Sequence, residues 1–314
     1  MSGVFEGSGN MANSVSVKGG TTKGVAIVTG ASAGMGKAIV RRLLADGWPV
    51  DGGARRVDQM ADIAALGAKV LQFDVTDETS MTNFVSSVLS AEGRVDALVN
   101  NAGYGSYGAV EDVPLSEARR QFDVNTFGLM RMSQLVLPAM RKQHSGRIIN
   151  ITSMGGRIWS PFGAWYHATK HAVEVLSDVM DFEVRPFGVR VVVVQPGGVA
   201  TEWGGIAADH LRASLKSSAY REKGTLVADV LENTKGASPE VIARVVAHAL
   251  NTARPRRQYA APFDAKALIF LRWLLPEGAW ARLIWFAVKS AARMAPPRAT
   301  KQQVGETNSH IPSR

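Results

Sequence analysis

The sequence contains no cysteine in its 314 residues. This absence excludes disulfide frameworks, cysteine-ligated zinc and iron–sulfur sites, and catalysis by a thiol. A chain without thiols is also in keeping with a reducing compartment, so we predict a cytoplasmic location.

Long apolar runs are missing as well. Crossing a bilayer takes roughly 18 uncharged apolar residues in a row. The nearest candidate is Ala267–Leu275, which Arg272 interrupts. Residues 1–22 are rich in Gly, Ser, Thr and Asn and have no apolar centre of the kind found in a secretory signal. We therefore predict a flexible tail over residues 1–22.

Charge is sparse over most of the chain. Charged residues make up 20% of the sequence and hydrophobic residues 46%, which suffices for a buried core and excludes a wholly disordered chain. The net charge is +9, and the residues from 252 onward hold eleven Lys and Arg against three Asp and Glu. The rest of the chain is close to neutral, which argues against a nucleic-acid partner.

Short runs rich in Val and Ile alternate with segments of helical spacing. The predicted strands are 24–29, 48–54, 69–74, 95–100, 147–152, 189–195 and 258–261. Helical patterns follow the first strand and cover 57–66, 77–91, 116–143 and 163–185. The strand at 48–54 is weak, because Asp51, Gly52 and Gly53 disfavour extended pairing. The alternation predicts an α/β fold: a Rossmann-type, doubly wound parallel sheet of about seven strands, in a single domain over residues 23–262.

Residues 263–314 form a basic, tryptophan-rich extension. Trp273, Trp280 and Trp285 stand among aliphatic residues and cations, and Pro276 and Gly278 divide the segment into two short helical pieces. One interpretation is that the two pieces pack back on the domain as a wall of the pocket. The other is a weak, membrane-peripheral contact, since tryptophan and cations on a short apolar helix are typical of an interfacial anchor on anionic lipid.

A glycine-rich turn follows the first strand. It runs from Thr29 to Gly36 and places Gly30, Gly34 and Gly36 just before a helix. Glycines let the backbone approach a diphosphate closely, and the amino end of the helix offers free N–H groups. Because the turn lies between a strand and a helix, it is a strong indication of a dinucleotide site.

The end of the second strand indicates which dinucleotide is bound. An acid there would bind the ribose 2′-hydroxyl of NAD, but this chain has Ala54 followed by Arg55 and Arg56. Guanidinium groups pair with phosphate oxygens, so NADP(H) is favoured and NAD(H) stays open.

Tyr166 and Lys170 lie four residues apart near the start of a helix, so they share one face. A free tyrosine is a poor acid–base at neutral pH, and we expect the ammonium group of Lys170 to lower the pKa of the Tyr166 phenol. Ser153 follows the fifth strand, at the carboxyl edge of the sheet where ligands bind.

Several motifs in this order resemble one family. They are T-G-A-S-A-G-M-G at 29–36, Asp74-Val75, N-N-A-G at 100–103, Asn125, Ser153, Y-H-A-T-K at 166–170 and P-G-G-V-A-T at 196–201. Together they resemble the short-chain dehydrogenases/reductases, in the branch with a Gly-x-x-x-Gly-x-Gly turn, over residues 23–262. The resemblance is greatest to members that act on hydroxysteroids and retinol.

This resemblance implies roles for four residues. Tyr166 would exchange a proton with the reacting oxygen, and Ser153 would hydrogen-bond the substrate carbonyl. Lys170 would hold the nicotinamide ribose and tune Tyr166, and Asn125 would support a water connecting Lys170 to solvent. The implied reaction is hydride transfer between the nicotinamide and a ketone, an aldehyde or a secondary alcohol.

The resemblance also implies cofactor contacts. Asp74 would contact the adenine amine, Asn101 the adjacent ribose, and Val199 and Thr201 the nicotinamide amide. With the glycine turn and the two arginines, the predicted cofactor-binding residues are Gly30, Ser32, Gly34, Met35, Gly36, Arg55, Arg56, Asp74, Val75, Asn101, Ala102, Gly103, Tyr166, Lys170, Pro196, Gly197, Val199 and Thr201.

Three other interpretations remain. His167, His171 and Glu174 share a helix face and could hold a metal, but no fourth ligand is evident and Glu174 is expected to be an exposed acid, so we predict no metal. A protein of this fold could instead be a dinucleotide sensor without catalysis. The chain could also be a membrane-surface retinoid, steroid or lipid dehydrogenase.

The expected substrate side is apolar. The segment 202–235 would form a lid, and Trp159 and Phe162 follow Ser153. Such a lining favours a small hydrophobic carbonyl compound or the matching alcohol. Members of the resembling family are often homo-oligomers, so a homo-oligomer is a further expectation for this chain.

Overall fold

The computed structural model describes residues 23–294. The predicted tail at 1–22 and the end of the extension, 295–314, lie outside the described residues. All strand pairs in the sheet are parallel. The order across the sheet is β3 (Lys69–Gln72), β2 (Val50–Ala54), β1 (Ala26–Thr29), β4 (Ala97–Asn100), β5 (Gly146–Ile151), β6 (Val189–Pro196) and β7 (Gln258–Ala261). The predicted doubly wound parallel sheet is confirmed.

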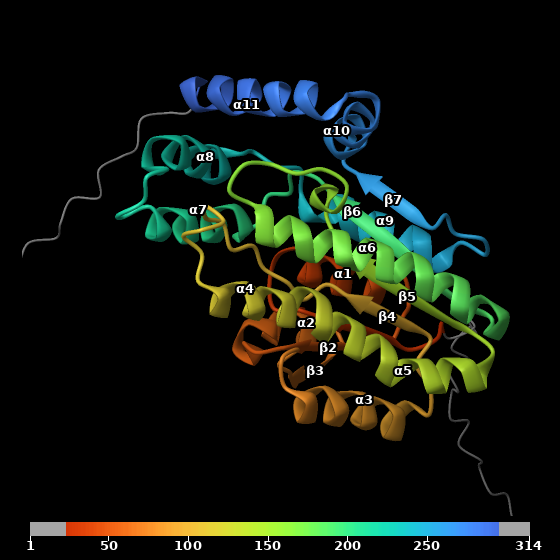
Figure 1. The fold of residues 1–314 in the computed structure, drawn as a ribbon. Coiled ribbons are helices and arrows are strands. Elements are labelled where there is room, and N and C mark those ends of the chain that lie inside the picture. The colour runs from red at the N-terminus through yellow and green to blue at the C-terminus, as the bar shows by residue number, and fades with distance from the viewer. Residues whose placement is uncertain (1–22, 295–314) are drawn as a thin grey trace, which may run out of the picture.

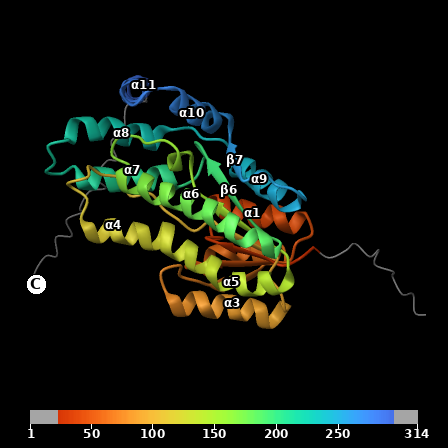
Figure 2. The ribbon, with the colours of Figure 1, turned by 45° about the vertical axis from the view of Figure 1, so that its right-hand side comes forward.

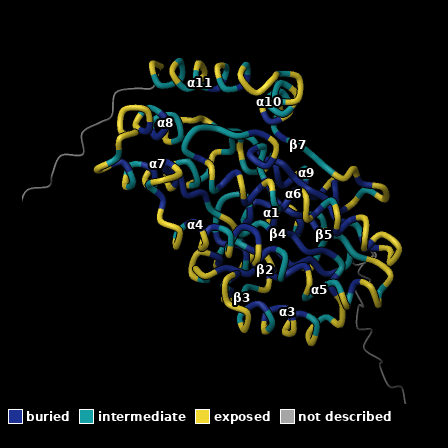
Figure 3. The backbone as a smooth tube through the Cα atoms, in the orientation of Figure 1, coloured by how far each residue is buried: buried dark blue, intermediate teal, exposed yellow. Residues whose placement is uncertain are grey.

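Helices cover both faces of the sheet (Figures 1 and 2). One face carries α1 (Gly34–Ala45), α2 (Ala61–Ala65) and α9 (Pro239–Asn251), and the other carries α3 (Glu78–Glu92), α5 (Leu129–Gln143) and α6 (Ala164–Val184). Figure 3 shows the strands buried between these layers. Burial on both sides is why the strands read as continuous Val/Ile runs.

The strand β2 forms despite its unfavourable composition. Gly53 faces α3, and a β-carbon there would lie 2.7 Å from the Phe84 ring and 3.0 Å from Phe73. A glycine is therefore needed for α3 to pack this closely on the sheet. Pairing with β1 on one side and β3 on the other compensates for the weak propensity.

The predicted long helix at 116–143 is interrupted. It consists of α4 (Leu115–Phe122), a wide π-helical turn at Asp123–Gly128, and α5. Turns of this type inside helices occur frequently at functional sites. Here the turn contains Asn125, which is fully buried.

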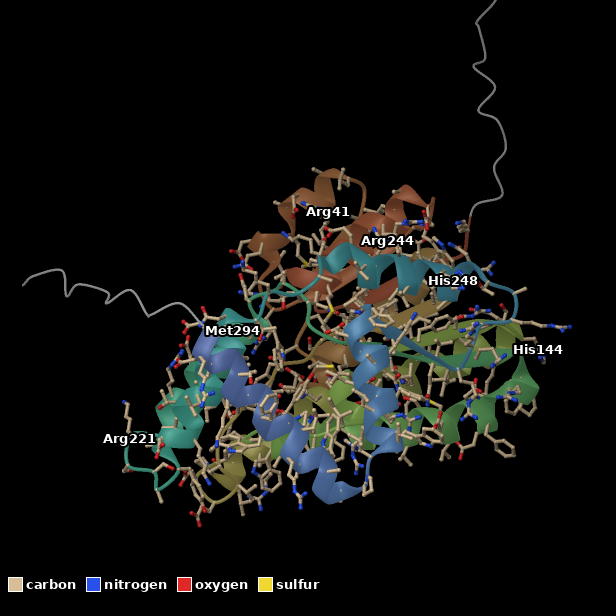
Figure 4. The ribbon with its side chains drawn as sticks, turned by 90° about the horizontal axis from the view of Figure 1, so that it is seen from above. Arg41, His144, Arg221, Arg244, His248 and Met294 are labelled. Carbon is tan, nitrogen blue, oxygen red and sulfur yellow. The ribbon has the colours of Figure 1, made fainter. Side chains whose placement is uncertain are left out.

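Two helical layers lie above the carboxyl edge of the sheet (Figures 1 and 4). The predicted lid consists of α7 (Trp203–Ser214) and α8 (Arg221–Asn233), and the extension consists of α10 (Phe263–Leu274) and α11 (Glu277–Met294). The predicted division of the extension near Pro276 is confirmed. Within residues 23–294, no helix has the length and apolarity needed to cross a membrane.

One buried carboxyl group makes stability depend on pH. Asp51 lies inside β2 with one carboxyl oxygen lacking a hydrogen-bond partner. Burial raises the pKa of Asp51 to about 6, although the charge of Lys69 acts in the opposite direction. The folded chain therefore binds this proton more tightly than the unfolded chain, whose aspartates titrate at about 3.9. The stabilisation is fully present below the unfolded value and is lost as the pH rises through the folded value.

We expect Asp51→Asn to stabilise the fold by roughly 2–3 kcal/mol at about pH 8 and to have little effect at about pH 4. Urea unfolding at the two pH values measures the difference. The exposed Asp58→Asn is the matched control and should change neither midpoint. An equal gain at both pH values would contradict the proposed titration.

Candidate active site

The glycine turn brings the start of α1 against the ends of two strands. Gly30 and Gly34 have φ values of 68° and 52°, which favour glycine. A β-carbon on Gly36 would lie 2.2 Å from the carbonyl oxygen of Gly30. The turn is therefore as tight as a diphosphate site requires. Ser32 within it is buried, and the half-buried Met35 packs on the core beneath α1.

The amino end of α1 fits an anionic group. Its N-cap residue, Ala33, makes no side-chain hydrogen bond to the helix, and the first turn contains no acidic residue. The first N–H groups of the helix are thus left for a ligand, and the helix dipole favours negative charge there. A dinucleotide diphosphate is the group that this arrangement fits.

Residues after β4 hold the glycine turn in place. The hydroxyl of Thr29 accepts hydrogen bonds from the backbone N–H groups of Asn101 and Ala102, at 3.0 and 3.1 Å. The side-chain amide of Asn101 donates to the carbonyl oxygens of Thr29 and Gly30, at 3.0 and 3.2 Å. The side chain of Asn101 therefore supports the turn from inside the protein, and its predicted contact with a ribose remains a prediction.

The end of β2 offers cations and no acid. Ala54 is buried, and Arg55 and Arg56 after it are exposed. Arg56 lies 3.9 Å from a carboxylate oxygen of Glu202, which directly precedes α7. Arg55 lines a groove of about 600 Å³ together with Asp74. This end of the sheet can therefore attract a phosphate group.

Asp74 stays ionised beside that groove. Burial acts to raise its pKa, but hydrogen bonds from the backbone and hydroxyl of Thr76, at 2.9 and 2.8 Å, hold the pKa below its usual value. A carboxylate here can accept a hydrogen bond from an amine. The neighbouring Val75 is buried in the core under α3 and α5, so its side chain does not face the groove.

Asn125 and Lys170 meet beside Gly103. A β-carbon on Gly103 would lie 3.1 Å from the Asn125 Oδ1 atom and 3.6 Å from the Lys170 Nζ atom. The side chain of Asn125 accepts from the N–H of Tyr104 at 3.0 Å and donates to its carbonyl at 2.9 Å. The ammonium group of Lys170 donates to the carbonyl of Ile151 at 3.0 Å. Three segments that are distant in sequence are thus fixed together.

Tyr166 lies in an apolar cluster under the lid. Its ring centroid is 5.1 Å from that of Trp203 and 6.0 Å from that of Tyr107, and only 7% of the residue is exposed. Residues of α7, α8 and α11 complete the cluster. The phenol is therefore enclosed by the lid and by the C-terminal extension.

The expected acidification of Tyr166 is wrong. Burial raises the pKa of the Tyr166 phenol to about 12, and hydrogen bonding with Ser153 lowers it only in part. The Lys170 Nζ atom lies 6.0 Å from the centre of the tyrosine ring and is engaged with Ile151. Burial also lowers the pKa of Lys170 to about 8. Enclosure in an apolar site disfavours both charged forms, and the charge of Glu174 offsets the effect on the pKa of Lys170 only in part.

Ser153 and His167 organise the loop after β5. The hydroxyl of Ser153 accepts from the N–H of Gly155 at 3.0 Å. His167 is buried, with its Nδ1 atom 2.9 Å from the Gly155 carbonyl, and its Nε2 atom accepts from the N–H of Ser160 at 3.1 Å. Burial lowers the pKa of His167 to about 4, so the neutral ring links both ends of the loop.

The acid Glu174, expected to be exposed, is buried. Its two carboxylate oxygens accept from the hydroxyl of Thr152 at 2.6 Å and from the side-chain amide of Gln195 at 2.9 Å. It therefore ties α6 to the ends of β5 and β6. Since His167 is also engaged, the three residues of the metal interpretation do not converge. No group of three or more potential metal ligands occurs within residues 23–294.

The segment after β6 crosses above the start of α1. A β-carbon on Gly34 would lie 3.1 Å from the methyl group of Thr201. Gly197 donates its N–H to the Ala261 carbonyl at 2.8 Å, and Val199 forms an isolated bridge with Ala237. Pro196 ends β6 itself. The predicted P-G-G-V-A-T residues therefore lie at the same edge of the sheet as the glycine turn.

The extension is attached to this edge at two places. Asp264 of α10 accepts a hydrogen bond from the N–H of Gly198 at 3.0 Å. On α11, the buried Trp280 donates to the Trp159 carbonyl at 3.3 Å, and Glu277 accepts from the Trp159 indole at 2.7 Å. The extension is thus part of the wall around the site.

Comparison with known proteins identifies the family. A family model described as short chain dehydrogenase matches residues 24–210. The chain belongs to the short-chain dehydrogenase family. It is therefore an NAD(P)-dependent dehydrogenase or reductase, as the sequence motifs predicted.

Relatives and solved structures indicate which kind of cofactor this short-chain dehydrogenase binds. It is 40% identical over 177 residues to a 3-ketodihydrosphingosine reductase of Bacteroides thetaiotaomicron, covering 56% of this chain and 64% of that protein. A short-chain dehydrogenase from Streptomyces avermitilis superposes with a TM-score of 0.72 at 31% identity, over 87% of this chain and 99% of that one. A serine dehydrogenase complexed with NADP+ gives a TM-score of 0.66 at 27% identity, over 76% and 94%. A nicotinamide dinucleotide is thus the cofactor.

Sequence reasoning missed the supporting roles of several residues. The sequence pattern indicates His167 and Glu174 only as candidate metal ligands, with Glu174 exposed, whereas both are buried and support the loop after β5 and the ends of two strands. Their spacing of seven residues on one helix face, the face of Lys170, was the available signal. The packing of Trp203 on Tyr166 had no local signal, because it depends on how the lid folds back.

Proposed function

We propose that this short-chain dehydrogenase reduces an apolar ketone with NADPH as hydride donor, and that Tyr166 donates the proton. The observation that carries the proposal is the placement of the Tyr166 phenol between Ser153 and an apolar cluster, at the edge of the sheet where the glycine turn lies. A bound nicotinamide would supply the hydride. The residues of the chain would orient the ketone and transfer the proton.

The raised pKa of Tyr166 suits the direction of reduction. A phenol with a pKa of about 12 holds its proton at neutral pH, so it can give the proton to an oxygen on which negative charge develops. Ser153 would hold the same oxygen. Lys170, with a pKa of about 8, would return a proton to the phenol, and Asn125 would keep Lys170 in place.

The side chains that surround Tyr166 support a substrate with a large apolar part. Aromatic rings of Tyr107, Phe162, Trp203 and Trp285 belong to the cluster around Tyr166. Binding pockets of this composition favour apolar ligands with few polar groups. The relative named 3-ketodihydrosphingosine reductase adds support for a ketone carried on a lipid-like chain. A closer relation to hydroxysteroid or retinol dehydrogenases remains a prediction.

An assay panel tests the reaction. Long-chain ketones, steroid ketones and retinal would be offered with NADPH and with NADH, and oxidation of the nicotinamide followed by its absorbance. Turnover of an apolar ketone with NADPH supports the proposal. Tight NADPH binding with no turnover of any compound would favour the sensor interpretation instead.

We propose that Arg55 and Arg56 make the site prefer NADPH to NADH. We expect Arg55→Ala to weaken NADPH binding by about ten- to a hundredfold and to leave NADH binding nearly unchanged, because a guanidinium–phosphate hydrogen bond contributes roughly 1.5–3 kcal/mol. Fluorescence titration with each nucleotide measures this. Arg244→Ala, on the exposed face of α9 (Figure 4), is the control. Equal loss of both nucleotides would refute a role for Arg55 at the 2′-phosphate.

A second copy of the chain is proposed to cover an apolar stripe on α6. Val175, Val179 and Phe182 share one helix face and are 64%, 51% and 78% exposed. We expect light scattering to give a mass above that of one chain, and Phe182→Glu to reduce it. A single-chain mass for the unmodified protein would contradict this. We also propose that the protein is located in the cytoplasm, in keeping with the absence of cysteine.

A further inference from the structure

The two C-terminal helices form the outermost layer on one side of the molecule. In Figure 4, α11 ends at Met294 and crosses α8, which starts at Arg221. The inner faces of these helices are occupied, since Trp280 and Ile284 are buried against the loop after β5. Their outer faces carry large side chains with no cover: Phe263, Phe270, Trp273 and Phe286 are 80%, 57%, 78% and 70% exposed.

The exposed residues form stripes at helical spacing. On α10 they are Phe263, Lys266, Phe270 and Trp273, and on α11 they are Arg282, Phe286, Lys289 and Arg293. Spacings of three and four residues place each set on one helix face. We call these two stripes together the outer face. It combines aromatic rings with cations.

The positive charge of the outer face is not neutralised nearby. Among the described residues, Lys266, Arg282, Lys289 and Arg293 form no ion pair. The two acids of the helices are engaged elsewhere: Asp264 accepts from Gly198, and Glu277 pairs with Arg272. The ammonium group of Lys289 lies 5.5 Å from the ring centre of Trp285 and stays exposed.

We propose that the outer face docks on a lipid bilayer that contains anionic lipid. Aromatic rings on short helices enter the border between headgroups and acyl chains, and neighbouring Lys and Arg side chains contact anionic headgroups. Each such cation near the surface contributes to attraction that salt weakens. Docking of this kind needs no helix that spans the membrane.

The charge pattern speaks against a second copy as the occupant. In a two-fold symmetric contact the same patch faces itself. The cations of the outer face, which include Arg282, Lys289 and Arg293, would then meet like charges with no acid of these helices free to balance them. A negatively charged surface is the complementary partner.

The same helices reach the reaction site from the other side. Trp285 and Val288 of α11 pack against the cluster that encloses Tyr166, next to α8. A substrate dissolved in the bilayer would therefore meet the helices that roof the pocket before reaching water. This link to the substrate rests on the proposed function, whereas the docking itself does not.

Vesicle sedimentation tests the docking without any substrate. The full chain would be mixed with vesicles of phosphatidylcholine and phosphatidylserine, or of phosphatidylcholine alone. We expect binding to the mixed vesicles that decreases with salt. The double variants Phe270→Ser with Trp273→Ser, and Arg282→Glu with Lys289→Glu, should each lose about tenfold in partitioning. Leu66→Ser with Leu115→Ser, exposed residues on other surfaces, should bind normally.

Two results would overturn the proposal. One is equal sedimentation of the aromatic variant and the unmodified chain. The other is a drop in molecular mass, measured by light scattering without lipid, on changing Phe270 and Trp273, which would assign the outer face to a second copy. Activity on a water-soluble ketone should be unchanged in both variants. If the unmodified chain has no activity on any water-soluble ketone, the proposed reaction is contradicted, whereas the docking result is unaffected.

Discussion

Replacing Tyr166 by phenylalanine is expected to lower kcat by roughly 10²–10⁴-fold, the contribution of one positioned proton donor. The substitution removes a single oxygen, and the ring keeps its contacts with Trp203 and Tyr107. NADPH binding should persist, because the glycine turn and the start of α1 are untouched. Steady-state kinetics and fluorescence titration measure the two effects separately.

Tyr107→Phe is the matched control for this experiment. Tyr107 lies in the same cluster, with its ring centroid 6.0 Å from that of Tyr166, and is equally enclosed. Removing its hydroxyl should leave most of the turnover. If both variants lose activity to the same extent, the effect comes from packing and the proton-donor role of Tyr166 is refuted.

Trp280→Ala should destabilise the protein by about 3–5 kcal/mol, the usual cost of truncating a buried tryptophan. Trp280 is fully buried, and its indole is bonded to the loop that begins at Ser153. We expect a lower urea midpoint, faster proteolysis within residues 263–294, and a reduced kcat, because the loop loses its support from α11.

The control for this variant is Trp273→Ala. Trp273 is 78% exposed on the neighbouring helix, so truncating it should change stability by no more than about 0.5 kcal/mol. Equal destabilisation by the two substitutions would show that Trp280 does not anchor the extension. If kcat is unchanged in Trp280→Ala, the extension does not support the catalytic loop.

Local patterns in the sequence predicted the parts of the site that depend on neighbouring residues. Gly30 follows a strand, Gly34 and Gly36 lie in the first turn of the next helix, and Tyr166 and Lys170 lie one helical turn apart. Parallel strands then bring their carboxyl ends to one edge of the sheet. Fold, glycine turn and catalytic candidates could therefore be predicted together.

Long-range packing explains what the sequence could not predict. The pKa of Tyr166 moved opposite to expectation because helices more than thirty residues downstream enclose it. Glu174 is buried because Thr152, directly after β5, and Gln195 of β6 satisfy its oxygens. The extension forms a wall because Trp280 reaches Trp159. None of these contacts has a signature in the adjacent sequence.

The wide turn at Asp123–Gly128 has a bearing on how this chain tolerates length changes. Such a turn accommodates one residue beyond the α-helical count. Because the extra residue is absorbed inside the turn, α4 and α5 keep the relative orientation of one continuous α-helix. Deleting one residue there would leave Met132, Val136 and Met140 against the sheet, although it would displace Asn125. A one-residue deletion within α5 itself would rotate the residues beyond it by about 100° and turn their apolar side chains toward solvent. We therefore expect a one-residue deletion within α5 to lower stability far more than one in the wide turn.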